Sequence, residues 1–475
     1  MSDLKSKTVN GLKWSAFERI FSQGIQFILI LILAKFLGPK AFGLIGMVAI
    51  FIAIGQVLVD SGFSSALIRK VDRTDVDYST ALYFNVSVSV VFYFFLYACA
   101  PYIAKFYEQP ELELLTRVIG LSLVVNSFCV VPRTILTVEM NFKALAKSSI
   151  TSVVIGGCVA LVLAYNKCGV WALVGQTLVI AICNAIFINV IVKWIPPAKF
   201  DRKSFNYLFG FGGRLLISGI LDTVYNNIYQ IIIGKKFSAF FVGQYTQANQ
   251  ISSIPAMTMT SIIQRVTYPM FCHMQHDINK MEEYYLLTMK VASLFIFPIM
   301  AGIAIIAKPS IALLLGEQWS EAAKLIVILS LAYMIYPIHA INLNILQVKG
   351  RSDLFLKVEI IKKMLGVIIV AVTMRYGIMA MCIGLLIHSY ISLLINIIYT
   401  AKLTTLGIWK QLVEISPIWL TAIFSCFIAW GCAIYFTANN FYQIVIMLVE
   451  APTIYFALVF LTQRKIVSLV LSIRK

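Results

Sequence analysis

Two apolar segments that carry many polar side chains decide how this sequence folds: FNYLFGFGGRLLISGILDTVYNNIYQ at residues 205–230 and QYTQANQISSIPAMTMTSIIQR at residues 244–265. In the first, Arg214, Ser218, Asp222 and Asn226 recur every four residues and Tyr229 follows three later, so a helix places them on one face. An unpaired amide in hydrocarbon costs several kcal/mol. This face therefore cannot lie against lipid, and we expect it to line a wet cavity or to pack on polar neighbours.

The composition is that of a membrane protein. Of 475 residues, 60% are hydrophobic and 13% are charged, and the mean hydropathy is +0.87. Because apolar runs recur along the whole length, we predict an all-α polytopic membrane fold. The net charge of +18 is carried by short connectors between the runs, which is the pattern that orients helices in a bilayer. We therefore expect no nucleic-acid partner.

Runs of about 20 apolar residues predict about fourteen transmembrane helices, of which the seventh and eighth are the least hydrophobic. The connector at 195–204 contains Pro196 and Pro197 and is the best internal boundary. We predict an N-terminal lobe of six helices at 1–200, a second lobe of six at 201–403 and a C-terminal helix pair at 404–475. The predicted spans are 12–36, 41–67, 79–104, 112–138, 145–166, 170–194, 206–234, 240–271, 284–307, 321–348, 354–375, 378–401, 414–437 and 441–462.

Lys and Arg are concentrated in every second connector, for example at 69–73, 193–203 and 349–363. The positive-inside rule places these connectors in the cytoplasm. With an even number of spans, both termini are then cytoplasmic, and we expect a multi-pass protein of the bacterial inner membrane.

The two predicted lobes carry a weak internal repeat. Shifted by 200 positions, the stretch from Lys35 to Gly43 lies over the stretch from Lys235 to Gly243. Six helices per repeat return the chain to its starting side. The lobes would then be parallel copies about an axis normal to the membrane.

Several classes of chemistry lack their sequence signals. A phosphate-cradling G-x-x-x-x-G-K-[ST] loop is absent, so transport is passive or ion-coupled unless a partner hydrolyses ATP. The nine cysteines include no C-x-x-C pair, and the four histidines include no i, i+4 pair beside a glutamate. We expect no catalytic residues, no metal and no cofactor, and we leave coupling to a proton or sodium gradient open.

Ionisable residues within predicted spans are functional candidates by default. Asp222 is read either as a coupling or ligand site or as a structural ion pair with an arginine. The arginines suit a phosphate, because guanidinium binds phosphate through two parallel hydrogen bonds and stays charged. The ionisable cavity candidates are Arg19, Asp60, Arg133, Arg214, Asp222 and Arg265.

Amide and tyrosine side chains on the seventh and eighth spans suit a sugar ligand, which offers hydroxyl groups and apolar faces. The same side chains also hold membrane helices together, at about 0.6 to 2 kcal/mol per contact, and both interpretations stay open. These candidates are Asn226, Tyr229, Gln230, Gln244, Tyr245, Gln247, Asn249 and Gln250.

A series of short motifs occurs in order along the chain: 37–44, 60–63, 66–68, 100–107, 110–112, 141–143, 169–176, 242–245, 265–269 and 315–319. In their order and spacing they resemble the polysaccharide-transporter branch of the multidrug/oligosaccharidyl-lipid/polysaccharide (MOP) flippase superfamily, the Wzx-type exporters of lipopolysaccharide, O-antigen and colanic acid. The resemblance implies two six-helix lobes around a central cavity, two extra helices and alternating access. It also implies a substrate, an oligosaccharide repeat unit on undecaprenyl pyrophosphate.

The partners implied are this lipid-linked oligosaccharide, membrane lipids, and polymerase or chain-length proteins. Two other function classes stay open. A drug/cation antiporter of the same superfamily would need a carboxylate cluster in one lobe, whereas the cavity candidates here are more basic than acidic. A membrane-embedded polymerase or glycosyltransferase would need a larger outside loop than the connectors provide.

Overall fold

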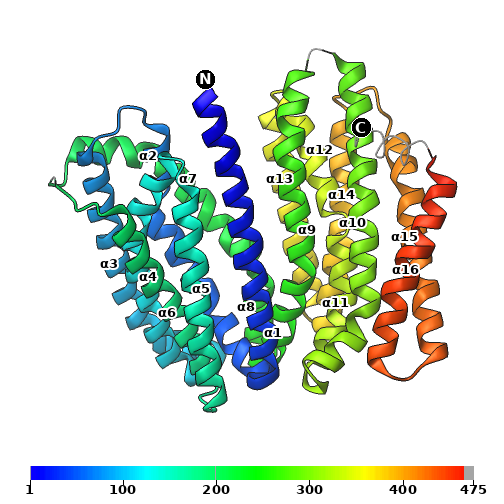
Figure 1. The fold of residues 1–475 in the computed structure, drawn as a ribbon, viewed down its shortest axis with the longest axis horizontal. Helices are drawn as coiled ribbons and strands as arrows, with labels where there is room; N and C mark the ends of the chain where they lie inside the picture. The colour runs from blue at the N-terminus through cyan, green and yellow to red at the C-terminus, as the bar shows by residue number, and fades with distance from the viewer. Residues whose placement is uncertain (1, 198, 276, 465–475) are drawn as a thin grey trace. The chain divides into compact units, whose positions relative to one another are not determined.

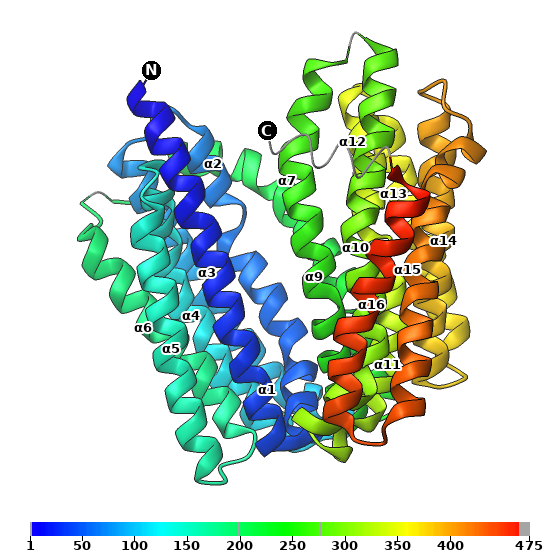
Figure 2. The same ribbon diagram turned by 45° about the vertical axis from the view of Figure 1, so that its right-hand side comes forward.

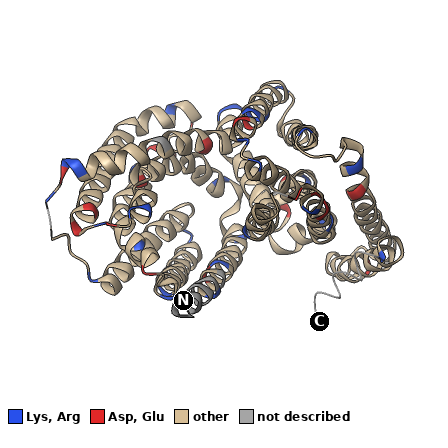
Figure 3. Cartoon of the chain, turned by 90° about the horizontal axis from the view of Figure 1, so that it is seen from above, with Lys and Arg blue, Asp and Glu red and all other residues tan. Residues whose placement is uncertain are grey.

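The computed structural model describes residues 2–197, 199–275 and 277–464, and every regular element in these ranges is helical. By its internal contacts the chain divides into one unit of residues 1–243 and another of residues 244–475. Each unit contains long helices that run alongside one another (Figure 1). Charged residues are sparse along these helices (Figure 3). The all-α membrane fold is thereby confirmed.

The helices of the first unit, in chain order, are α1 (Ser2–Asp60), α2 (Phe63–Arg69), α3 (Asp75–Tyr107), α4 (Glu111–Val138), α5 (Phe142–Tyr165), α6 (Trp171–Val192), α7 (Arg202–Asn226), α8 (Ile228–Lys236) and the start of α9 (Ala239–His273). Those of the second unit are the rest of α9, α10 (Ile278–Leu314), the 3-10 turn η1 (Glu317–Trp319), α11 (Ser320–Tyr333), α12 (Tyr336–Val348), α13 (Ser352–Thr373), α14 (Ile378–Ala401), α15 (Ile408–Phe436) and α16 (Asn440–Thr462).

Every predicted span falls on helical segments, but the second (41–67) runs from α1 into α2 and the tenth (321–348) covers both α11 and α12. The first two are joined within α1 across a kink at Gly38, where φ is 70° and Pro39 follows. The seventh is broken at Asn227 into α7 and α8. Among the described residues, 11 helical segments are long and apolar enough to cross a membrane.

Helices α9 and α13 are long enough to cross a membrane but are not among these 11 segments. Helix α9 carries the amide-rich segment, whereas α13 carries Lys357, Glu359, Lys362 and Lys363 within its length. Amide and charged side chains lower the mean hydropathy of a helix without preventing it from lying inside a protein bundle. We therefore expect the polar groups of both helices to contact other parts of the protein or water, and not lipid.

In the first unit, α3 packs on α4, α5 packs on α6, and α1 packs along α5 (Figure 2). Helix α7 joins the same unit by packing against α1, α2 and α3. An aromatic cluster at this junction stacks Phe63 on Phe84 at 4.8 Å between ring centroids, and Phe205 of α7 lies 5.0 Å from Phe84. The seventh span is thus packed on helices of the first six.

In the second unit, α10 is the helix on which the C-terminal pair α15 and α16 packs. The Tyr455 hydroxyl of α16 donates to the Leu294 carbonyl at 2.9 Å. The buried Tyr285 hydroxyl of α10 lies 2.8 Å from Oδ1 of Asn342 and 2.8 Å from Oε1 of Gln411, on α12 and α15. Buried polar groups of this kind fix one arrangement of helices, because each would be costly to leave unpaired.

Candidate functional site

Helix α7 presents three different sectors around its axis. One is packed: a Cβ added at Gly212 would lie 2.5 Å from the Ser61 carbonyl oxygen, and one at Gly219 would lie 2.9 Å from a methyl of Val57. A second sector is apolar and exposed, with Ile217 and Leu221 both 64% accessible. Helix α7 can approach α1 this closely because its packed sector carries glycine.

The third sector is polar and exposed, and it contains Ser218, Asp222 and Asn226. Apolar groups such as Ile217 and Leu221 are compatible with lipid, but a carboxylate and an amide are not. The neighbouring sectors of one helix therefore face different surroundings. The polar sector, which we call the α7 stripe (Ser218, Asp222, Asn226), is suited to water or a polar ligand.

The other predicted residues of the seventh span directly precede or follow the α7 stripe in the sequence. Tyr229 and Gln230 are half-buried on α8, directly after the break at Asn227. The Asn227 side chain donates to the Thr223 carbonyl at 2.8 Å and so closes the end of α7. The backbone of Arg214 belongs to α7, but its side chain lies outside the described residues.

Three other predicted residues, Asp60, Arg19 and Arg133, belong to α1 and α4. Asp60 is half-buried on α1, one turn from Val57, and accepts a hydrogen bond from the Ser64 hydroxyl at 2.5 Å. Arg19, on the first half of α1, and Arg133, on α4, are both exposed. The polar pair of Asn126 and Gln56, 3.3 Å apart between α4 and α1, was not among the predicted residues.

The predicted residues of α9 lie mostly in a helix-packing seam. Gln244 is fully buried, and its amide donates to the Gln318 carbonyl at 2.6 Å and accepts from the Ala322 N–H at 2.8 Å. Oδ1 of Asn249 accepts from the Tyr333 hydroxyl at 2.7 Å. These bonds agree with the helix-packing interpretation that the sequence left open.

Two further hydrogen bonds extend this seam toward the end of α9. The Ser330 hydroxyl lies 3.2 Å from that of Ser252, and the Asn344 amide donates to Thr267 at 2.9 Å. From Gln244 with Ala322, through Ser252 with Ser330, to Thr267 with Asn344, the partners advance in the same direction as α9, so α11 and α12 run parallel to it. Of the other predicted residues, Tyr245 and Gln247 are buried, Gln250 is half-buried and Arg265 is exposed.

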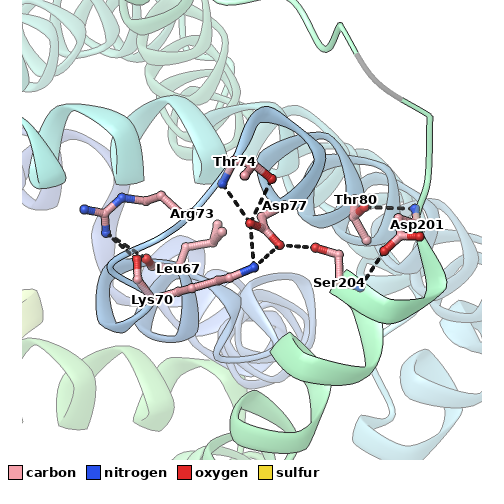
Figure 4. Close-up of polar contacts among 8 residues, drawn as sticks. All are labelled: Leu67, Lys70, Arg73, Thr74, Asp77, Thr80, Asp201 and Ser204. Carbon is pink, nitrogen blue, oxygen red and sulfur yellow. Dashed lines mark hydrogen bonds and ion pairs between the residues drawn. The ribbon is translucent and has the colours of Figure 1, made fainter.

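A buried carboxylate that was not predicted fixes the beginning of α7. Asp77, only 1% exposed, accepts from Nζ of Lys70 at 2.8 Å through both oxygens and from the Thr74 N–H at 2.8 Å (Figure 4). The Ser204 hydroxyl of α7 also donates to Asp77. We call Lys70, Asp77 and Ser204 the α3–α7 anchor.

Hydrogen bonds to α3 also hold the connector that leads into α7. The Asp201 N–H donates to the Thr80 hydroxyl at 3.1 Å, and Nε1 of Trp194 donates to Asp75 at 3.2 Å. Asp201 also caps α7 by accepting from the Ser204 N–H at 2.8 Å. The connector thus sets where α7 begins, and with it the orientation of the α7 stripe.

A cavity of about 470 Å³ adjoins this anchor. Both signs of charge line it, which leaves no strong preference for an anion or a cation. Its lining residues are Lys70, Asp72, Thr74, Val76, Asp77, Asp201, Lys203, Ser204 and Tyr207.

Sequence reasoning also missed a group of titratable residues in the second unit: His339, Glu359, Lys362 and His388. All four fall inside predicted spans. Lys362 was instead counted with the basic connector at 349–363, and the histidines were judged only as metal ligands. These residues could have been found from the sequence, because ionisable residues within a transmembrane span are rare and often functional.

Comparison with known families agrees with this architecture. A family model described as "Polysaccharide biosynthesis protein" matches residues 32–324. The chain is similar to the teichuronic acid biosynthesis protein TuaB of Bacillus subtilis, with 25% identity over 74% of each chain. It is also similar to the lipopolysaccharide biosynthesis protein WzxC of Escherichia coli, with 23% identity over 83% of this chain and 80% of that one.

Solved structures of low identity show the same fold. The lipid II flippase MurJ in an inward closed conformation superposes with a TM-score of 0.77 over 95% of this chain and 99% of its own, at 13% identity. An inward-facing multidrug resistance MATE family transporter of the MOP superfamily gives a TM-score of 0.63 over 81% of this chain and 94% of its own, at 16% identity. Since the family model covers more than half of the sequence, the chain belongs to the polysaccharide biosynthesis protein family.

Proposed function

We propose that this protein is a flippase that carries lipid-linked oligosaccharide repeat units across the bacterial cytoplasmic membrane by alternating access. The observation that carries the proposal is the α7 stripe, an exposed polar sector beside exposed apolar residues of the same helix, in a chain of the polysaccharide biosynthesis family. A lipid-linked sugar needs a polar route only for its head group, because the lipid tail can remain in the bilayer.

The chemistry of the stripe fits the sugar portion of such a head group. Asp222 and Asn226 offer a carboxylate and an amide, which hydrogen-bond to hydroxyl groups. In the proposed substrate these sugars are joined to undecaprenyl pyrophosphate. The exposed arginines, Arg19, Arg133 and Arg265, are the groups suited to the pyrophosphate, since guanidinium matches phosphate geometry and keeps its charge.

The proposed membrane orientation has both termini in the cytoplasm, as the distribution of Lys and Arg predicts. The repeat unit would then be taken up at the cytoplasmic face and released outside, where polymerase and chain-length proteins could receive it. Surface polysaccharide would depend on this step.

The test is deletion of the gene in its own host, followed by separate measurement of lipid-linked sugars in the two leaflets. We expect repeat units to accumulate at the cytoplasmic face while the surface polymer is lost. A deletion strain with no redundant flippase in which repeat units still reach the outer face would refute the proposal. Drug sensitivity of that strain with normal polymer would instead support an antiporter.

A further inference from the structure

The cavity beside the α3–α7 anchor lies where two long helices, α3 and α7, begin. Its lining residues fall at 70–77 and 201–207, before or at the start of the predicted spans 79–104 and 206–234. The polar head groups of a bilayer lie at this depth, just outside the hydrocarbon core. The cavity volume of about 470 Å³ is within the range of small-ligand sites, about 300 to 1,000 Å³. The cavity is therefore placed and sized for a lipid head group.

Some of the charges that line the cavity already have partners within the protein. Both oxygens of Asp77 accept from the Lys70 ammonium at 2.8 Å, and the Ser204 hydroxyl also donates to Asp77 (Figure 4). Asp201 accepts from the Ser204 N–H at 2.8 Å. These bonds connect α3 to the beginning of α7 and form one wall of the cavity.

Two side chains of opposite charge at the cavity remain available to a ligand. Asp72, in the turn between α2 and α3, and Lys203, in the first turn of α7, are both exposed. Neither side chain forms a hydrogen bond or an ion pair with another described residue. A carboxylate accepts hydrogen bonds from a primary ammonium, and a lysine ammonium donates to a phosphate. Together they suit a ligand that carries both charges.

A ligand of a single charge fits the cavity less well. A lone anion attracted by Lys203 would be repelled by Asp72, whereas a lone cation bound at Asp72 would be repelled by Lys203. A phosphate joined to a primary ammonium by a short linker meets each of them with the opposite charge. The favoured ligand chemistry is therefore a phosphoethanolamine group, either free in solution or as part of a lipid.

Exposed apolar side chains beside the cavity favour the lipid. Val76 and Tyr207 line the cavity and are 36% and 51% exposed. On α3, Val76 is followed by the exposed Tyr83, Val91 and Phe94, at spacings that place them on one face of the helix. An acyl chain attached to the head group would lie along this face. A soluble phosphoethanolamine would leave it uncovered.

We propose that this cavity binds the head group of phosphatidylethanolamine, with Lys203 on the phosphate and Asp72 on the ammonium. The bound lipid would connect the turn before α3 to the first turn of α7, alongside the α3–α7 anchor. It would stabilise the beginning of α7 without being transported. The site does not depend on the proposed function, because its ligand is a membrane lipid and not the lipid-linked sugar.

Native mass spectrometry of the purified, delipidated full chain measures the binding directly. The probes are phosphatidylethanolamine, phosphatidylcholine and phosphatidylglycerol with identical acyl chains, so that only the head group differs. Phosphatidylcholine keeps the positive charge but has no N–H to donate, and phosphatidylglycerol has no ammonium. We expect phosphatidylethanolamine to bind at least about tenfold more tightly than either, the effect of one hydrogen bond to a charged group. Equal affinities of the three lipids would overturn the proposal.

Two variants separate the two ends of the site. Asp72→Asn should weaken the binding of phosphatidylethanolamine about tenfold, to the level of phosphatidylcholine, because the partner of the ammonium is lost. Lys203→Met should weaken all three lipids alike, since each carries the phosphate. The site is wrong if Asp72→Asn keeps the preference for phosphatidylethanolamine, or if Lys203→Met binds the lipids as the unaltered chain does.

Matched controls remove the same kinds of charge outside the cavity. Lys199→Met alters the same connector, and Glu139→Gln alters an exposed carboxylate directly after α4. Both should bind the three lipids like the unaltered chain. A control that loses the preference as fully as Asp72→Asn would assign it to general surface charge and overturn the site.

Conservative variants and a folding check exclude a loss of structure. Asp72→Glu and Lys203→Arg keep the two charges and should retain the preference for phosphatidylethanolamine. Thermal unfolding in lipid-free detergent shows whether each variant is folded before its lipid binding is compared.

Soluble phosphoethanolamine distinguishes the free ligand from the lipid. It should displace little bound phosphatidylethanolamine, because it cannot cover the apolar face of α3. Displacement at concentrations similar to those of the lipid itself would show a site for a soluble ligand and overturn the lipid assignment.

The effect on α7 is measured by tryptic cleavage of the connector at 193–204. Phosphatidylethanolamine at ten times its Kd should slow this cleavage by up to about tenfold, because the lipid binds only the closed connector. Asp72→Asn should show much less protection at the same lipid concentration. Unchanged cleavage of the unaltered chain would show that the lipid does not hold the beginning of α7.

Discussion

Gly43 and Gly243 form a reciprocal contact between the two repeated stretches of the chain. A Cβ added at Gly43 would lie 1.6 Å from the Ala239 carbonyl oxygen, and one added at Gly243 would lie 1.9 Å from the Pro39 carbonyl oxygen. Under a shift of 200 positions, Gly43 corresponds to Gly243 and Pro39 to Ala239. Each repeat therefore gives the other the same contact, as at a twofold interface.

This contact predicts that neither glycine tolerates alanine. Gly43→Ala or Gly243→Ala should force the two backbones apart and lower the free energy of unfolding by about 1 to 3 kcal/mol, the usual cost of overpacking. Thermal unfolding of the purified chain in detergent measures the effect. Gly24→Ala is the control, because a Cβ there meets nothing within 4 Å. Equal stability of all three variants would show that the contact is not maintained.

The α3–α7 anchor predicts that Asp77 holds the start of α7. Asp77→Asn should destabilise the protein by about 3 kcal/mol, because it leaves the mostly buried Lys70 ammonium without its carboxylate. Limited proteolysis of the connector at 193–204, together with thermal unfolding, measures this. Asp72→Asn changes an exposed carboxylate at the same cavity and should have little effect. Similar behaviour of the two variants would argue against the anchor.

The sectors of α7 predict opposite outcomes for adjacent residues. Asp222→Leu should leave membrane insertion intact but reduce surface polysaccharide at least tenfold, because the polar surface is lost. Leu221→Asp should instead reduce the amount of inserted protein, since a carboxylate in hydrocarbon costs about 2.5 to 3.5 kcal/mol. Immunoblots of membranes and assays of surface polymer measure both effects. Asp222→Leu with normal polymer would remove Asp222 from the site.

The buried Tyr285 hydroxyl should contribute to the stability with which the C-terminal helix pair packs on α10. Tyr285→Phe leaves Asn342 and Gln411 without this partner and should cost about 1 to 3 kcal/mol of stability. Thermal unfolding in detergent measures the loss. Tyr284→Phe, at the exposed neighbouring position, should be neutral. If Tyr285→Phe were as stable as Tyr284→Phe, the network would contribute nothing to docking.

The sequence by itself determined the all-α membrane fold, the positions of the spans and the polarity of α7. Each depends on the local order of apolar and polar residues, which a helix converts directly into faces. The repeat at Gly43 and Gly243 was also visible, because a repeat is a property of the one-dimensional order.

Only the tertiary structure decided which polar residues are buried and which are exposed. Gln244 and Asp222 look alike in sequence, since both are polar residues in apolar segments, but Gln244 is fully buried against η1 and α11 whereas Asp222 is exposed. Asp77 with Ser204, and His339 with Asn396, are likewise pairs formed between helices distant in the chain. Spacing along one helix carries no information about the helix beside it, so these pairs could not be predicted.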